Sequence, residues 1–459
     1  MSQIENPMGT RPIMRLLMSM SVPAMVSMLI QSMYNIVDSL FVGRLSQEAL
    51  TAVSIVFPLQ NLVLAVAVGT GVGLNASIAR SMGEKNQREV DEAASHGLML
   101  TFFHIAGFVL LGLLGSRWFV GLFTDSAEIL KMGCDYSYIV ICLSGASLVH
   151  ILIEKIFQAT GCMLLPMLMQ IAGAAVNMVL DPILIFGLFG FPALGVRGAA
   201  VATVIGQCCA CSLAVGMYFK ANSGVHISLR GFRWNAAMVK RLYGVGIPSG
   251  MIMSMPSLLV GLLNGILAGI SQAAVAVFGI YFKLQTFVYM PTNGLIQGMR
   301  PIMSYNYGAR NDKRMRQTLY CSVGVTAGIM AAGTILFLFG AEWILRMFGA
   351  EREMMDMGTE AFHIICIGFL FSGVGVIVAG AFEALGKGMQ SLVISLLRQM
   401  LIIPPLAFLL VKFTGLGLKG VWLTFPVAEA TASVVAVILY LRVWREIESD
   451  FGKEVGRNL

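Results

Sequence analysis

The chain consists of two copies of one unit, offset by 225 residues. The proline Pro23 of the first copy matches Pro248 of the second, and Trp118 matches Trp343. Longer matches keep the same spacing and order without a gap: Ser46-Gln47 with Ser271-Gln272, Leu59-Gln60 with Leu284-Gln285, Gly83-Glu84-Lys85-Asn86 with Gly308-Ala309-Arg310-Asn311, and Phe157-Gln158-Ala159-Thr160-Gly161 with Phe382-Glu383-Ala384-Leu385-Gly386. Such a duplication restricts the fold to two similar halves. In membrane proteins it is typical of transporters with a substrate path between the repeats.

Apolar residues dominate both halves. Of the 459 residues, 57% are hydrophobic and only 12% are charged, whereas soluble domains carry about 25% charged residues. Long apolar runs bounded by charge, glycine or proline predict twelve membrane-spanning helices, six in each half. The expected helices span residues 13–42, 51–82, 90–115, 128–160, 163–188, 195–220, 237–268, 274–307, 313–340, 353–386, 388–412 and 418–444. The sequence therefore predicts an all-α polytopic membrane protein with two pseudo-symmetric six-helix lobes.

A polar, basic segment at residues 221–236 separates the halves and has no counterpart inside either repeat. It predicts an N-terminal lobe of residues 1–220 and a C-terminal lobe of residues 237–459, joined by a cytoplasmic linker. With the N-terminus placed inside the cell, Lys and Arg of the inside loops outnumber those of the outside loops by more than two to one, which favours cytoplasmic termini. Six is an even number, so both halves insert the same way up, as a parallel repeat. We expect a multi-pass protein of the cell (inner) membrane with both termini in the cytoplasm.

The motifs of several other protein classes are missing or incomplete. The basic residues lie in short loops rather than in a patch or stripe, which argues against a nucleic-acid partner. The eight cysteines lie in or beside apolar segments without metal-ligand spacing. The nearest phosphate-loop match, Gly380 to Gly388, has the wrong spacing and lacks a Ser or Thr after Lys387. No zinc-protease or nucleophile-elbow motif is present, so we expect neither an enzyme nor a bound cofactor.

Two acidic residues inside apolar segments break the repeat. Asp38 of the first expected helix matches Leu263 in the second copy, and Asp181 of the fifth matches Leu406. A charged side chain within a membrane costs roughly 2.5–3.5 kcal/mol on insertion scales, so such residues usually face a cavity and have a function. The alternative, that each Asp is a structural cap or pairs with Lys or Arg, is less attractive because both occur in one half only.

The residues around Asp181 favour cation binding. Asn177 lies four residues earlier and so on the same helix face. Pro182 removes a backbone donor and tends to bend the helix, which frees a carbonyl near the acid. Two carboxylates, an amide oxygen and a free carbonyl would suit a hard cation such as Na⁺, and two carboxylates in a dry lobe can also hold a proton. The residues leave the choice between Na⁺ and H⁺ open.

Other intramembrane charges are weaker candidates for the substrate path or for a second coupling site. Lys283 and Glu429 lie near the middle of their expected helices, where they can pair with one another or face a substrate. Glu383 and Arg300 lie close to inner helix ends, where snorkelling towards water is an ordinary explanation.

At these residues the chain resembles the prokaryotic branch of the multidrug and toxic compound extrusion (MATE) family, along essentially its whole length. The resemblance rests on Gln31-Ser32-Met33-Tyr34-Asn35-Ile36-Val37-Asp38, Phe157-Gln158-Ala159-Thr160-Gly161, Asn177-Met178-Val179-Leu180-Asp181-Pro182 and Leu194-Gly195-Val196-Arg197-Gly198-Ala199-Ala200-Val201-Ala202-Thr203. It implies two six-helix lobes around a central cleft and export of substrate in exchange for Na⁺ or H⁺.

The resemblance also assigns roles to residues. It implies a coupling-ion site at Asp38, Asn177 and Asp181, with Thr203 as a candidate hydroxyl ligand. It implies a conformational hinge at Pro23, in addition to the bend expected at Pro182. Tyr34 and Asn35 belong to the motif of Asp38 and are candidates for the substrate path. Other members place coupling acids in the C-terminal lobe, but this chain has only Glu383 in the apolar part of its tenth expected helix, residues 361–386, and none in the seventh.

The function expected from these observations is cation-coupled antiport. Such a transporter would export small organic, mainly cationic, drugs by alternating access, would work as a monomer in a lipid bilayer, and would use Na⁺ or H⁺ rather than a cofactor. The alternative is a flippase or exporter of a lipid-linked or other endogenous metabolite, for which we would expect additional helices and a cleft rich in arginine.

Overall fold

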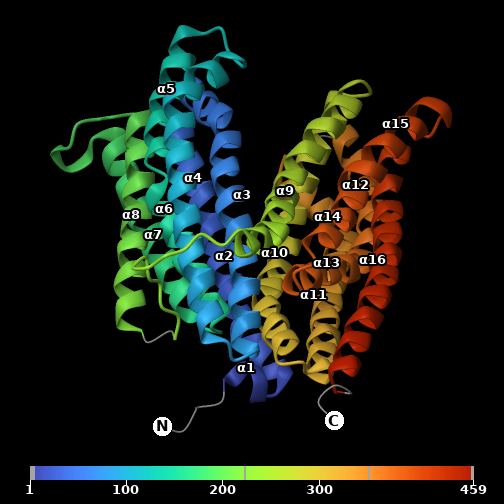
Figure 1. Cartoon of the computed structure of the whole chain (residues 1–459). Helices are drawn as coiled ribbons and strands as arrows, with labels where there is room; N and C mark the ends of the chain where they lie inside the picture. Colours follow the sequence, from blue (N-terminus) through green and yellow to red (C-terminus); the bar gives the residue numbers. More distant parts are fainter. Residues whose placement is uncertain (1–5, 222–223, 350–351, 456–459) are drawn as a thin grey trace. The chain divides into compact units, whose positions relative to one another are not determined.

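The computed structural model describes residues 6–221, 224–349 and 352–455, and within these ranges every regular element is a helix (Figure 1). Among the described residues, eleven helices are long and apolar enough to cross a membrane, or twelve if a bent pair counts as one span. This confirms the all-α fold with about twelve spans that the apolar runs predict.

The chain forms two compact units, and each contains a segment from the other half of the sequence. We call Val22–Gly250 the N-terminal unit, and Met1–Ser21 with Met251–Leu459 the C-terminal unit. Helices α2 (Ile13–Leu45) and α9 (Ala236–Ala268) each pass from one unit into the other. These boundaries differ from the expected lobes of residues 1–220 and 237–459.

The remaining helices fall within single units. Those of the N-terminal unit are α3 (Gln47–Gly83), α4 (Gln87–Gly121), α5 (Ala127–Cys142), α6 (Gly145–Ala159), α7 (Leu164–Phe186), the short η1 (Leu188–Gly190) and α8 (Val196–Lys220). Those of the C-terminal unit are α1 (Pro7–Thr10), α10 (Gln272–Gly308), α11 (Asp312–Met347), α12 (Arg352–Ile365), α13 (Ile367–Ala384), α14 (Gly388–Leu396), the π-helical η2 (Leu397–Ile402), α15 (Ile403–Phe413) and α16 (Gly417–Val455).

The duplication is visible in backbone detail. Helices α3 and α10 begin and end at positions one repeat apart in the sequence. The serines Ser46 and Ser271 cap their first turns. In the turn that follows each helix, Lys85 and Arg310 both adopt a left-handed conformation, with φ of 57° and 55°. Equivalent sequence therefore produces equivalent local structure in the two units.

Three helices predicted as continuous are interrupted. The segment predicted at 128–160 is two helices, α5 and α6, bent by 42° at a break that precedes Gly145. The segment predicted at 353–386 divides at Cys366 into α12 and α13. In the segment predicted at 388–412 a π-helical turn separates α14 from α15, and Pro404 and Pro405 follow it. These prolines lack the N–H groups that an α-helix would use there.

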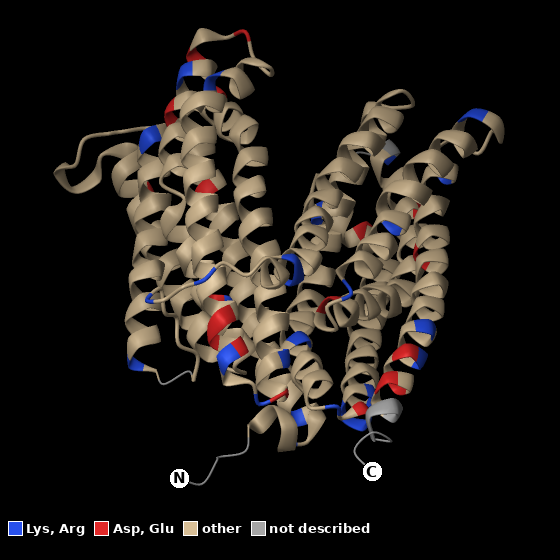
Figure 2. Ribbon diagram, in the orientation of Figure 1, with Lys and Arg blue, Asp and Glu red and all other residues tan. Residues whose placement is uncertain are grey.

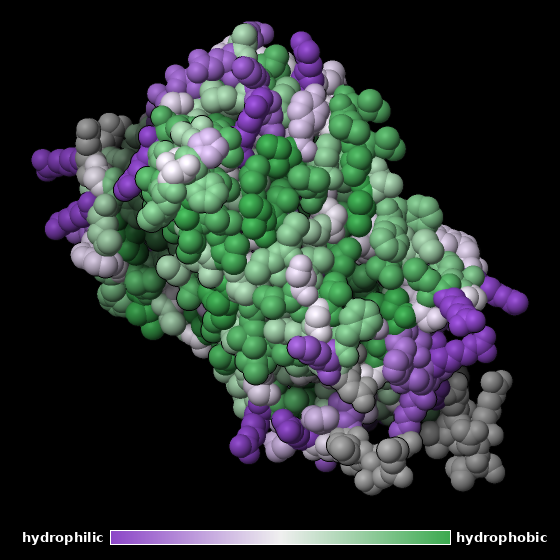
Figure 3. Space-filling view, turned by 90° about the vertical axis from the view of Figure 1, so that its left-hand side faces the viewer, coloured by the Kyte–Doolittle hydropathy of each residue, from purple (hydrophilic) through white to green (hydrophobic). Residues whose placement is uncertain are grey.

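The surface matches a membrane environment. Charged residues gather towards the ends of the helices (Figure 2), while the face seen in Figure 3 is a broad apolar band with hydrophilic side chains at its two ends. Large apolar side chains such as Leu114, Phe219 and Phe339 are highly exposed. Apolar surface of this extent indicates contact with lipid rather than water.

The first part of α2 is anchored in the C-terminal unit. The carbonyl of Met8, just before α2, accepts hydrogen bonds from Asn306 at 3.1 Å and from Arg314 at 3.0 Å. Further along, the Ser21 hydroxyl donates to the carbonyl of Leu295 at 3.4 Å. The close approach requires Gly298, because a Cβ there would lie 2.8 Å from the backbone nitrogen of Ser21.

The first part of α9 is anchored in the N-terminal unit in the matching way. Glycines of α3 allow close contact, because a Cβ at Gly69 would lie 2.5 Å from the carbonyl oxygen of Gly246. At Gly73 it would lie 2.1 Å from the carbonyl oxygen of Leu242. The duplicated prolines Pro23 and Pro248 lie within two residues of the points where α2 and α9 leave one unit for the other.

Candidate functional site

Helices α7 and α8 of the N-terminal unit are held together by two glycine contacts. A Cβ on Gly206 would lie 2.8 Å from the carbonyl oxygen of Gly173, and one on Gly198 would lie 2.4 Å from that of Leu184. Side chains larger than hydrogen are therefore excluded at both points, and the helix backbones approach closely. Between these contacts α7 carries Asn177 and Asp181, and α8 carries Thr203.

These three polar side chains meet in the interior of the unit. The Asn177 amide nitrogen Nδ2 donates to Oδ1 of Asp181 and to Oγ1 of Thr203, each at 3.3 Å. Asn177, Asp181 and Thr203 are all buried, and Asp181 has no exposed surface. Because both donor bonds of the amide are used, its oxygen Oδ1 is left as an acceptor.

Helix α2 brings a second carboxylate to the same site. Asp38 lies close enough to Asp181 for their charges to interact, and Tyr34, one turn earlier, lies within hydrogen-bonding reach of Thr203. The aromatic rings of Phe41 and Phe186, 6.3 Å apart, hold this part of α2 against α7. The structure thus brings together the coupling-ion residues expected from the sequence, with Tyr34 beside them.

Three buried oxygen atoms in this cluster have no hydrogen-bond partner among the described residues. They are Oδ1 of Asp38, Oδ1 of Asn177 and Oδ2 of Asp181. A buried acceptor without a partner costs free energy, more so when it is charged. Oxygen atoms in this arrangement can be satisfied by a hard cation, which prefers carboxylate and amide ligands, or by protons on the carboxylates. We call the cluster of Asp38, Asn177, Asp181 and Thr203 the acidic site.

The structure adds residues that sequence reasoning missed. The buried Tyr136 of α5 accepts a hydrogen bond from Gln60 of α3 at 3.3 Å, and its hydroxyl is within electrostatic range of Asp38 and Tyr34. On α8, Gln207 lies one turn beyond Thr203, and its oxygen Oε1 is buried without a partner among the described residues. The only sequence signal for them is a polar side chain within an apolar helix.

Of two other residues expected near the acidic site, Pro182 lies next to it and Asn35 does not. Pro182 lies inside α7 directly after Asp181, so the carbonyl of Met178 lacks its usual helical donor. Asn35 is exposed on α2 and is not brought into the cluster.

The charged candidates of the second half pair differently from the expectation. Glu429 of α16 pairs with Arg398, at 3.7 Å, and not with Lys283, which is exposed on α10. Glu383 of α13 forms an ion pair with Arg300 of α10. Both glutamates are buried, so snorkelling into water does not explain Glu383.

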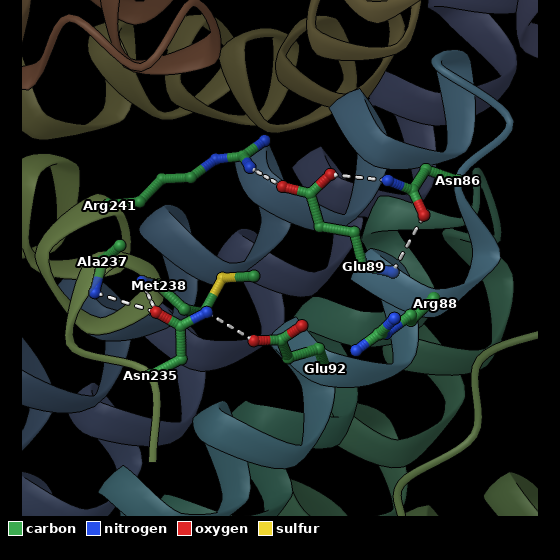
Figure 4. Close-up of a pocket in the computed structure, with 8 residues that line it drawn as sticks. All are labelled: Asn86, Arg88, Glu89, Glu92, Asn235, Ala237, Met238 and Arg241. Carbon is green, nitrogen blue, oxygen red and sulfur yellow. Dashed lines mark hydrogen bonds and ion pairs between the residues drawn. The ribbon is translucent and has the colours of Figure 1, made fainter. Parts of the chain in front are cut away.

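A pocket of about 380 Å³ in the N-terminal unit lies where α4 begins. Figure 4 shows Glu89 of α4 between the amide of Asn86 and the guanidinium of Arg241, with which it forms an ion pair. Asn235 donates to Glu92 at 2.7 Å and accepts from the backbone N–H of Ala237, at the start of α9. These contacts attach the end of the linker and α9 to α4, so we interpret this pocket as structural.

Comparison with known proteins identifies the family. The chain matches the MatE family twice, over residues 23–183 and 248–409, which together make up most of its length. It is 26% identical over 446 residues to the FAD transporter of Shewanella oneidensis, covering 95% of this chain and 96% of that protein. It is 25% identical over 438 residues to the multidrug export protein MepA of Staphylococcus aureus, covering 93% of each chain.

Solved structures agree in fold. A MOP superfamily transporter from Pyrococcus furiosus superposes with a TM-score of 0.90 at 22% identity, covering 98% of this chain and 99% of that one. The crystal structure of MATE in the bent conformation also gives a TM-score of 0.90, at 23% identity, and covers 96% of this chain and 98% of that one. With the duplicated family match, the helical spans and the relatives of nearly equal length, the chain belongs to the MATE family of membrane transporters.

Proposed function

We propose that the chain is a cation-coupled antiporter that exports small organic cations by alternating access. The observation that supports this most directly is the set of three buried oxygens of Asp38, Asn177 and Asp181 that lack partners among the described residues. The multidrug export protein named above supports the substrate class. The coupling ion is Na⁺ or H⁺, and either would bind at the acidic site.

Coupling requires the ion to favour one conformation over another. To shift a two-state equilibrium from 1:99 to 99:1, ligands must bind the two states with affinities that differ by about 5.5 kcal/mol. A cation that satisfies two buried carboxylates can supply much of that difference, because the same carboxylates are costly to bury when charged and unpaired. Binding of the cation then lowers the affinity for the exported cation, and the two leave on opposite sides.

The experiment is efflux of ethidium from cells or vesicles that contain the native chain, with Asp38→Asn and Asp181→Asn as variants. We expect both variants to lose gradient-driven efflux, because an amide carries no charge for a cation to neutralise. Asp135→Asn is a matched control, since Asp135 is an acid of the same unit that pairs with Arg197 at 2.9 Å. Normal efflux by the two site variants would exclude the acidic site from coupling.

The coupling ion is distinguished in the same assay. A Na⁺ gradient imposed at equal pH on both sides should drive efflux if Na⁺ is the coupling ion, and a pH gradient without Na⁺ should drive it if H⁺ is. If neither the Na⁺ gradient nor the pH gradient drives efflux, antiport is contradicted.

A second candidate is export of an endogenous anionic metabolite, in line with the alternative of a lipid-linked or other metabolite exporter. The relative named FAD transporter, which matches this chain over nearly its full length, favours it. Cells that overproduce the native chain should then accumulate flavin nucleotides in the medium, compared with cells that carry an empty vector. Unchanged flavin in the medium would remove this candidate.

Monomeric action and cytoplasmic termini belong to the same proposal. The chain before α2 contacts the end of α10, because Asn306 donates a hydrogen bond to the carbonyl of Met8. The end of α16 contacts the turn after α10, because the Phe451 ring lies 5.9 Å from the Arg310 guanidinium. The two segments therefore lie on one side of the C-terminal unit. Reporter fusions at each end test that this side is cytoplasmic, and light scattering of the purified protein tests the monomer.

A further inference from the structure

The C-terminal unit contains a polar cavity of its own, of about 120 Å³. It is bounded by α9, α10, α13, α14 and the π-helical turn η2, and we call it the arginine cavity because two arginines, Arg300 and Arg398, line it. Its other polar lining residues are Asn293, Glu383, Ser391 and Ser395. At about 30 Å³ per water molecule, the space is about that of four waters, which is enough for one charged group of a ligand.

Arginines outnumber carboxylates among the residues that line the arginine cavity. Arg300 pairs with Glu383, which also lines the cavity, whereas Arg398 pairs with Glu429, which does not. The lining therefore carries two guanidinium groups and one carboxylate. Both arginine side chains keep 19% of their surface accessible.

The ion pairs leave hydrogen-bonding capacity unused. A guanidinium has five N–H donors, but Nε of Arg300 and Nη1 of Arg398 have no hydrogen-bond partner among the described residues. Nη1 of Arg398 is 3.7 Å from Oε2 of Glu429, too far for a hydrogen bond. Guanidinium groups match the two oxygens of a carboxylate or phosphate better than any other side chain.

The placement of Arg398 depends on local structure that the first half of the chain lacks within its described residues. Arg398 belongs to the π-helical turn Leu397–Ile402, a type of irregularity that occurs frequently at functional sites. Its guanidinium also lies over the ring of Tyr289, 5.9 Å from the centroid.

The duplication makes the charges informative. One repeat earlier, the positions of Arg300, Glu383, Arg398 and Glu429 are held by Asn75, Gln158, Gly173 and Val204, all uncharged. Conversely, Asp38 and Asp181 of the acidic site match leucines in the second half. Intramembrane charges are costly to keep unless they have a function, and here each half carries its own set: carboxylates alone in the acidic site and arginines in the arginine cavity.

We propose that the arginine cavity binds an anionic oxygen group, a carboxylate or a phosphate, of the transported compound. That the compound is transported rests on the proposed function, whereas its binding at the arginine cavity does not. The substrates would then include zwitterionic and anionic compounds, with the anionic group at Arg300 and Arg398. The neutral donors of Asn293, Ser391 and Ser395 complete the cavity.

The test compares ligand pairs that differ only in the anionic group. Flavin mononucleotide is compared with riboflavin, which lacks the phosphate, and norfloxacin with its ethyl ester, which lacks the carboxylate. Binding is measured at equilibrium by fluorescence, with the purified full-length protein in nanodiscs. We expect the native protein to bind the anionic member of at least one pair about tenfold more tightly, and the pair that shows this distinguishes phosphate from carboxylate.

The main variant replaces Arg398→Gln and Glu429→Gln together, because removing only one partner would leave a buried charge unpaired. We expect it to lose the preference for the anionic member while its affinity for riboflavin or the ester stays within about twofold. Arg316→Gln with Glu448→Gln, an ion pair of the same unit outside the cavity, is the control and should keep the preference.

Equal or absent binding of both members by the native protein would overturn the proposal. So would a main variant that weakens both members equally, which is the behaviour of a purely structural ion pair. The binding assay uses no gradient, so the two proposals can fail separately. If the protein does not pump ethidium but still prefers the anionic member, the proposed function is wrong and the binding site stands.

Discussion

At the scale of single residues, the acidic site depends on glycines as much as on acids. Gly173, Gly198 and Gly206 let α7 and α8 approach closely enough for Asn177 to bond both Asp181 and Thr203 at 3.3 Å. Without this approach the two carboxylates would keep their charges, but the amide would no longer be fixed between Asp181 and Thr203.

Gly206→Ala tests this dependence. The new methyl group would lie 2.8 Å from the Gly173 carbonyl oxygen and 3.0 Å from the Cβ of Asn177, so α7 and α8 must move apart. We expect a loss of about 1–3 kcal/mol in the free energy of unfolding, as for other overpacked sites, together with weaker ion-driven efflux.

The control for that substitution lies on the same helix. A methyl group added at Gly216 would meet no neighbouring atom within 4 Å, so Gly216→Ala should be neutral or raise stability by up to about 1 kcal/mol, the helix propensity difference. Thermal unfolding of the two purified variants measures both effects, and equal stabilities would show that the close contact does not matter.

Part of the acidic site could be predicted from residues close together in sequence. Asn177 and Asp181 are four apart on one helix, and the helix period alone places them on one face. Tyr136 and Gln60 could not be predicted, because they come from helices whose contacts are set by packing. The pairing of Glu429 with Arg398 was missed for the same reason, since position along a helix does not specify its neighbours.

At the scale of helices, the most informative elements are the two that pass between units. Pro23 lies near the point where α2 leaves the C-terminal unit, and Pro248 near the point where α9 leaves the N-terminal unit. Each lacks a backbone donor, which weakens the helix locally. A change between conformations that bends both helices would therefore bend them here.

Pro23→Ala and Pro248→Ala should each slow ethidium efflux several-fold while leaving its equilibrium affinity within about twofold, because alanine restores the hydrogen bond and stiffens the helix. Pro166→Ala is the control, since Pro166 lies in the first turn of α7, where no helical hydrogen bond is lost. Unchanged efflux by both hinge variants would show that neither proline limits the transition.

Helix positions were predictable because apolar runs and repeat spacing are local signals. The interruptions were not, since a helix that divides at Cys366 keeps the same apolar pattern on both sides. A partial signal exists just after η2, where Pro404 and Pro405 in the first turn of α15 lack the N–H groups that would continue a helix from the preceding turn. Another exists at Ser144-Gly145, where α6 begins.

At the scale of the whole molecule, each compact unit is assembled from both halves of the sequence. The C-terminal unit includes residues before Val22, and the N-terminal unit includes the linker and α9 up to Gly250. The expected boundaries at 220 and 237 were based on the polar linker. Composition marks that segment as polar and basic, but composition alone does not say to which unit the neighbouring helices belong.

A chain divided in the linker, as residues 1–221 and 222–459, tests this arrangement. We expect neither piece to be stable alone, because each lacks a segment that packs against its glycines, and we expect co-expressed pieces to co-purify and to transport ethidium. Size-exclusion chromatography of each piece and of the pair measures this. A monodisperse, thermally stable single piece would contradict it.

The exchange of segments also bears on how the duplication arose. A single-copy ancestor with this fold could complete its unit only with the first helix of another molecule, so it would have been an obligate pair with swapped ends. Fusion of the two genes would have made the swap permanent within one chain. Only then could the copies diverge, so that one carries the acids and the other the arginines, since in a symmetric pair every substitution appears twice.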